Sequence, residues 1–224
     1  MALPLFIATA GFYFSYWSVF TEVPFHQHLH GLTATAWFLL LILQPWLHKQ
    51  GNMKLHRRFG FIGLFLAGAV VFSALQVVGN NLANERLDSV LRYGLTWADF
   101  LFLTGFSHAV LMAMWWSKDT AVHARYMIAS AIWALLPALA RLIYYPMIVI
   151  NGYPPPVSFV NVIYSSVALI VVTVLLVAAL DYRLEKKLYT SYILVAAVTL
   201  LFGVTFRYMG ESLWWIAFCD RLLA

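Results

Sequence analysis

The segment His26-Gln27-His28-Leu29-His30-Gly31 runs directly into residues 32–47, an apolar stretch without Asp, Glu, Lys or Arg. Roughly 20 apolar residues in a helix cover the hydrocarbon core of a bilayer, so this stretch predicts a membrane-spanning helix with three histidines at one mouth. If the helix begins at Pro24, then His26, His30, Trp37 and Gln44 share one face. We expect that face to point at protein, and the histidines to mark a site, because they are costly near lipid without partners.

The composition is that of a polytopic membrane protein. Of 224 residues, 63% are hydrophobic and 10% are charged, whereas soluble domains carry about 25% charged residues. Cys219 is the single cysteine, which excludes an internal disulfide and a Cys-rich zinc or iron–sulfur site. The net charge is +5, but the basic residues lie between apolar runs, so we expect the lipid bilayer as a partner and no nucleic acid.

Apolar runs predict an all-α fold, a polytopic helix bundle with seven transmembrane helices in one domain, residues 1–224. The predicted spans are residues 1–20, 24–47, 59–78, 94–116, 124–145, 158–180 and 192–206. In the tail, residues 210–224, Leu213-Trp214-Trp215-Ile216 is accompanied by acidic and basic residues. That mixture favours an interfacial helix over an eighth span.

Lysine and arginine gather in the connections after the second, fourth and sixth predicted spans. The basic residues there are Lys49, Lys54, Arg57, Arg58, Lys118, Arg125, Arg183, Lys186 and Lys187. The positive-inside rule therefore predicts that these connections are cytoplasmic in a bacterial inner membrane. The N-terminus is then cytoplasmic and the C-terminus lies outside.

In this topology, one layer of ionisable residues lies toward the outside. It contains His26, His28 and His30, with Asp99 in the fourth span and Arg141 near the outer end of the fifth. Asp99 and Arg141 are the predicted buried charge pair, because each alone is costly at that depth. The layer can line an outward-facing cavity. A structural ion pair beside interfacial histidines explains the same residues equally well.

A second layer of histidines lies toward the cytoplasm. His56 opens a helix with a face of small residues that admits a neighbouring helix or a flat cofactor: Gly60, Gly63, Ala67 and Ala74. His123 shares a face with Arg141 if residues 124–145 form one helix, and His108 lies deep in the fourth span. Caps, lipid-phosphate contacts or satisfied interior histidines are the alternatives, and His48 is interpreted as an ordinary loop residue.

Two histidine motifs carry a resemblance. His56-Arg57-Arg58-Phe59-Gly60 has the pattern H-R-x-x-G, and His123-Ala124-Arg125-Tyr126-Met127 has the pattern H-x-R-x-M, on a segment that ends in Arg141-Leu142. Residues 25–145 resemble bacterial predicted membrane proteins of unknown function that carry both motifs. The arrangement is also similar in a general way to b-type cytochromes, which implies that histidines on facing helices hold a haem.

Three functional hypotheses follow. The first is a redox-active protein that binds a metal or haem and has an electron partner. Its metal set is His26, His28 and His30, and its cofactor set is His56, His108 and His123. The candidate cofactors are haem, copper, iron or zinc. The second is a transporter or receptor that binds a small molecule through His30, Asp99 and Arg141. The third is a non-catalytic assembly protein. No catalytic motif decides whether the chain is an enzyme.

Overall fold

The computed structural model describes residues 2–85 and 87–223, and within them the regular secondary structure is helical, with no strand. Five helices are long and apolar enough to cross a membrane: α2 (Phe25–Lys49), α3 (Met53–Leu82), α4 (Ser89–Trp115), α7 (Phe159–Glu185) and α8 (Thr190–Glu211). The pair α5 (Thr120–Trp133) and α6 (Leu136–Asn151) adds a sixth crossing if it counts as one. The predicted all-α membrane bundle is confirmed, but the count of seven spans is not.

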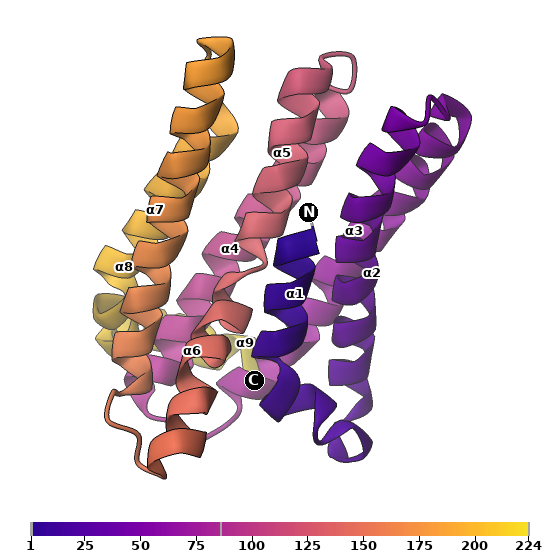
Figure 1. The fold of residues 1–224 in the computed structure, drawn as a ribbon. Coiled ribbons are helices and arrows are strands. Elements are labelled where there is room, and N and C mark those ends of the chain that lie inside the picture. The colour runs from indigo at the N-terminus through magenta and orange to yellow at the C-terminus, as the bar shows by residue number, and fades with distance from the viewer. Residues whose placement is uncertain (1, 86, 224) are drawn as a thin grey trace.

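The first predicted span, residues 1–20, is not one long helix. Helix α1 (Ala2–Gly11) has 10 residues and is followed by a π-helical turn, Tyr13–Trp17, and a 3-10 turn, Phe20–Glu22. Ten residues rise about 15 Å, half of the roughly 30 Å hydrocarbon core. Figure 1 shows α1 between the α2–α3 hairpin and the α5–α6 pair. An apolar composition predicted a span here, but the helix ends halfway.

Glycine at the end of α1 permits a backbone-to-backbone crossing with α6. A Cβ atom at Gly11 would lie 2.1 Å from the carbonyl oxygen of Ala138. No side chain fits at that distance, so the last turn of α1 rests directly on α6. This contact sets the position of α1 inside the bundle.

The fifth predicted span is broken. Helices α5 and α6 meet at an angle of 41° across Ala134 and Leu135. Pro137 explains the break, because its ring clashes with the carbonyl four residues earlier, that of Trp133, and it has no N–H to donate. At the second position of α6 the missing N–H is harmless. The single face predicted for His123 and Arg141 therefore does not exist.

The small-residue face of α3 packs against α2. A Cβ atom at Gly63 would lie 2.6 Å from the Leu40 side chain, and Ala67 and Ala74 are buried. Of the two occupants predicted for this face, a helix or a flat cofactor, the helix is present at Gly63.

The connections α2–α3, α4–α5 and α7–α8 lie at one end of the bundle, the upper end in Figure 1. These are the three connections rich in lysine and arginine. At the other end, helix α9 (Leu213–Leu223) packs on α4 and α8 and buries Trp215 and Cys219. Its 11 residues rise about 16 Å, too little to cross a bilayer.

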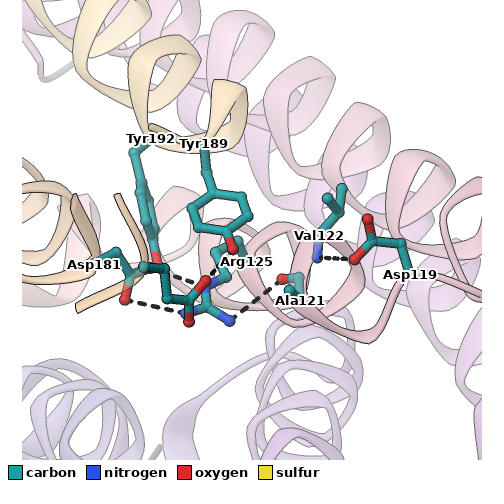
Figure 2. A network of polar contacts seen from close by, with 8 residues as sticks. Asp119, Ala121, Val122, Arg125, Asp181, Tyr189 and Tyr192 are labelled. Carbon is teal, nitrogen blue, oxygen red and sulfur yellow. Dashed lines mark hydrogen bonds and ion pairs between the residues drawn. The ribbon is translucent and has the colours of Figure 1, made fainter. Parts of the chain in front are cut away.

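An ion-pair network joins α5 to α7 and α8 at the end with the basic connections (Figure 2). Arg125 Nε lies 2.8 Å from Asp181 Oδ2, and Nη2 lies 2.5 Å from Glu185 Oε1. Tyr192 donates to Asp181 at 3.1 Å, and Tyr189 donates to Glu185. The bond to Glu185 raises the pKa of the Tyr189 phenol, so the phenol remains a donor at neutral pH. From the sequence, Arg125 was a basic residue of a predicted cytoplasmic connection and part of the H-x-R-x-M motif. Neither role predicts this network.

We expect Arg125→Gln to destabilise the bundle by roughly 3 kcal/mol, because Asp181 and Glu185 would lose their countercharge in a partly buried place. Equilibrium unfolding in detergent micelles measures the loss. Arg207→Gln is the matched control, since the Arg207–Glu211 pair is 70% and 53% exposed, and such pairs contribute about 1 kcal/mol or less. Equal losses in the two variants would contradict a structural role for Arg125.

Candidate functional site

A cavity of about 270 Å³ lies inside the bundle, walled by α1, the turn after it, α2, α3, α4 and the α5–α6 break. The wall is mostly apolar, with several aromatic side chains: Phe12, Trp17, Phe38, Phe102, Phe106 and Trp133. The volume lies just below the roughly 300–1,000 Å³ of pockets for drug-sized ligands. The cavity is therefore suited to a small molecule.

Three ionisable residues proposed from the sequence line this cavity. His30 comes from α2, Asp99 from α4 and Arg141 from α6. These helices are distant in the sequence, and the bundle brings them to a common wall. They are the three residues of the transporter or receptor hypothesis.

Asp99 and Arg141 share the cavity without direct contact. Within residues 2–85 and 87–223, no nitrogen–oxygen distance of 4.0 Å or less joins them as an ion pair. The Asp99 carboxylate has no hydrogen-bond partner in the described part of the chain, and its oxygens are not among the fully enclosed atoms. The predicted charge pair therefore forms no direct contact among the described residues.

Arg141 is held in place by neutral groups. Its Nη1 donates to the Pro137 carbonyl at 3.0 Å, and its guanidinium carbon lies 4.9 Å from the centre of the Phe12 ring. A guanidinium has five N–H donors, so most of them have no partner among the described residues. An anion in the cavity would supply both the acceptors and the countercharge.

The orientation of the His30 ring is set by a small hydroxyl network. His30 Nδ1 lies 3.3 Å from Ser73 Oγ, which in turn lies 3.0 Å from the Val70 carbonyl oxygen. Ser73 Oγ also lies 2.9 Å from Thr33 Oγ1, which donates to the Leu29 carbonyl. The single Ser73 hydrogen therefore goes to Val70 or to Thr33, and His30 Nδ1 is the donor in its bond to Ser73. In the neutral ring, Nε2 is then left as an acceptor.

His28 lies beside the turn that follows α1. Its Nδ1 is 3.1 Å from the Tyr16 hydroxyl, and Tyr16 lines the cavity. Gly31 makes this possible, since a Cβ atom there would lie 2.9 Å from the Tyr16 ring. His26 has other surroundings, with a buried Nε2 that has no hydrogen-bond partner among the residues that the structure describes. In the described residues, no group of three or more His, Cys, Asp or Glu side chains is arranged to hold a metal ion.

Two of the inner histidines come together. The ring centres of His56 and His123 are 6.4 Å apart, and the centre of the His48 ring is 5.9 Å from that of His56. His108 instead contacts Tyr126, with ring centres 6.0 Å apart. The sequence-based interpretation grouped His108 with His56 and His123 and treated His48 as an ordinary loop residue. In the structure, His48 and not His108 is the neighbour of His56.

The Nδ1 atoms of the paired histidines both face main-chain carbonyls. His56 Nδ1 lies 3.3 Å from the Gln44 oxygen, and His123 Nδ1 lies 2.8 Å from the Ala113 oxygen. A carbonyl only accepts, so each Nδ1 is a donor. The side-chain Nε2 of Gln44 donates to the His56 main-chain carbonyl at 3.1 Å, and this bond connects α2 to the start of α3.

Sequence reasoning missed Tyr16 and Ser73, the residues that orient the histidines. Tyr16 lies in an aromatic group at the end of the first predicted span, and Ser73 is an isolated hydroxyl in an apolar helix. An unexplained serine inside a predicted span is the signal that could have identified Ser73, because such a hydroxyl needs a partner.

The fold and the cavity define a class, an integral membrane helix bundle with opposite charges exposed in an internal cavity. Comparison of the chain with protein families, with curated proteins and with solved structures found no match.

Proposed function

We propose that the protein is a transporter-type membrane protein that binds a small organic molecule with an anionic group in the cavity. The observation that carries this proposal is the Arg141 guanidinium, which lines the cavity and has no carboxylate within 4.0 Å in the described part of the chain. A cation inside a membrane bundle is costly without a countercharge. A ligand carboxylate provides that charge and matches the planar donors of arginine.

The break between α5 and α6 favours transport over a static receptor. Trp133, Ala134 and Pro137 lie at the break and line the cavity. Transporters commonly bind their substrates where a membrane helix is discontinuous, because the two halves can move relative to each other. A structural assembly protein has no need of a cavity with charged walls.

For the orientation, we propose that the three basic connections face the cytoplasm of a bacterial inner membrane. Helix α9 then lies on the outer side, and the amino end of α1 points toward the cytoplasm (Figure 1). His30 is near the start of α2, at the end away from the basic connections. The cavity is therefore closer to the outer side.

Cysteines substituted for Lys54, Lys118 and Lys186 should resist a membrane-impermeant maleimide in intact cells, whereas a cysteine at Pro154 should react. The native Cys219 has 0% exposure and should add little background. Labelling after cell lysis shows that the resistant positions are reactive once reached. Reaction of position 54 in intact cells would invert the orientation and place the cavity nearer the cytoplasm.

We expect 4-methylpentanoate, a small apolar carboxylate, to bind the protein in lipid nanodiscs, as measured by isothermal titration calorimetry. Arg141→Gln should weaken this binding at least tenfold, because the countercharge is lost. Arg141→Lys should retain part of it, and Arg207→Gln, at an exposed arginine of α8, should leave it unchanged. Equal affinities of the wild type and Arg141→Gln would contradict the proposal.

A second candidate function, metal binding, rests on His56 and His123. With both Nδ1 atoms donating to carbonyls, both Nε2 atoms are left as ligands in the neutral rings, the arrangement typical of metal-binding histidines. Two imidazoles on one ion have ring centres about 5–6 Å apart, given metal–nitrogen bonds of about 2.0–2.1 Å. The 6.4 Å separation is near that range. Zinc, copper or iron suits such ligands, and a haem iron would use the same atoms.

Metal analysis and an absorption spectrum of the purified protein test this second function. Zinc or copper should bind the wild type, and the double variant His56→Ala/His123→Ala should lose it. His108→Ala is the control, since His108 packs on Tyr126 instead. A wild type that neither carries nor takes up a metal would eliminate this function and leave the cavity proposal intact.

A further inference from the structure

The cavity contains one group of each charge. Asp99 presents a carboxylate and Arg141 a guanidinium, both in the wall, and they form no direct ion pair among the described residues. Arg141 contacts the Pro137 carbonyl and the Phe12 ring instead of Asp99. Two opposite charges that line one cavity without an ion pair between them can be satisfied together by one ligand.

We propose that the ligand is a small zwitterion with an ammonium and a carboxylate group, as in an amino acid. Arg141 binds the carboxylate, and Asp99 binds the ammonium. This inference rests on the proposed function and specifies its ligand class. A simple anion would pair with Arg141 but bring a like charge toward Asp99, and a simple cation would do the reverse.

His30 adds a second acceptor for the ammonium group. Its Nδ1 donates to Ser73, so the neutral ring has Nε2 available as an acceptor, and the residue lines the cavity. An ammonium has three N–H donors and can use more than one acceptor. Asp99 and His30 together match this requirement, whereas a carboxylate would find no donor in a neutral His30.

Most of the rest of the wall is apolar and suits an apolar side chain, although Thr9, Gln27, Thr35 and Asn81 also line it. Phe102, Phe106 and Trp133 line the cavity, and its volume of about 270 Å³ leaves room for one branched aliphatic group or one aromatic ring beside the charged ends. The ligand class is therefore a zwitterion with a modest apolar body, not a polar or multiply charged one.

Three probes that differ only in their charged groups test the inference. Leucine carries both groups, 4-methylpentanoate lacks the ammonium, and 3-methylbutylamine lacks the carboxylate. Calorimetry on the full chain in nanodiscs should show leucine binding at least tenfold more tightly than either analogue. Phenylalanine and alanine, run in parallel, test the size of the apolar body.

Each of two variants should remove the preference of the protein for leucine over one of the analogues. Asp99→Asn should weaken leucine at least tenfold and leave 4-methylpentanoate unchanged or tighter, because the repelling charge is gone. Arg141→Gln should weaken the binding of leucine and leave the binding of 3-methylbutylamine unchanged. A merely structural role would lower the affinity of every probe together. Glu211→Gln, at an exposed acid of α8, is the control that should change nothing.

The outcomes separate the two proposals. If 4-methylpentanoate binds the wild type as tightly as leucine and needs Arg141, the zwitterion is wrong and the anion site stands. If Asp99→Asn weakens all probes equally, the zwitterion is also wrong. If neither the amino acids nor the two analogues bind, both proposals fall.

Discussion

A charge inside a helix bundle that faces lipid needs a partner within the bundle, because the hydrocarbon offers none. Arg125 meets this requirement through Asp181 and Glu185, both in α7, and it joins α5 to α7 as a result. Among the described residues, Arg141 meets it through a carbonyl and an aromatic ring alone. Arg125 therefore stabilises the fold, whereas most N–H donors of Arg141 have no partner among the described residues and can bind a ligand. This difference in partners distinguishes a residue that holds the fold together from one available to a ligand.

The cavity lies where two elements stop short. Helix α1 ends at Gly11, and α5 ends at Trp133 where Pro137 prevents the helix from continuing. Phe12, Tyr16 and Trp17, which follow α1, line the cavity on one side, and Trp133 and Pro137 line it at the break. The charged site therefore borders irregular backbone on two sides.

Much of this arrangement follows from local sequence patterns. The apolar run after His30 predicts α2, and its buried Trp37 and Gln44 lie on the predicted protein-facing side. Hydropathy does not predict that α1 stops after ten residues, because aromatic residues in a turn are as apolar as those in a helix. Pro137 was a readable signal of the broken span. The Arg125–Asp181 contact joins positions 56 residues apart and has no local pattern at all. Whether His48 or His108 lies beside His56 likewise depends on how separate helices pack.

The crossing of α1 with α6 has a mechanical consequence. Gly11 rests on the backbone of Ala138, and the neighbouring Phe12 ring lies against the Arg141 guanidinium, one turn further along α6. The position of α1 and the surroundings of the Arg141 guanidinium are thus linked through the Phe12 ring. Any outward displacement of α1 that uncovers the cavity also removes the ring from the guanidinium. Admission of a solute and release of the arginine would then be the same movement, and a solute that binds the arginine would take the place of the departing ring.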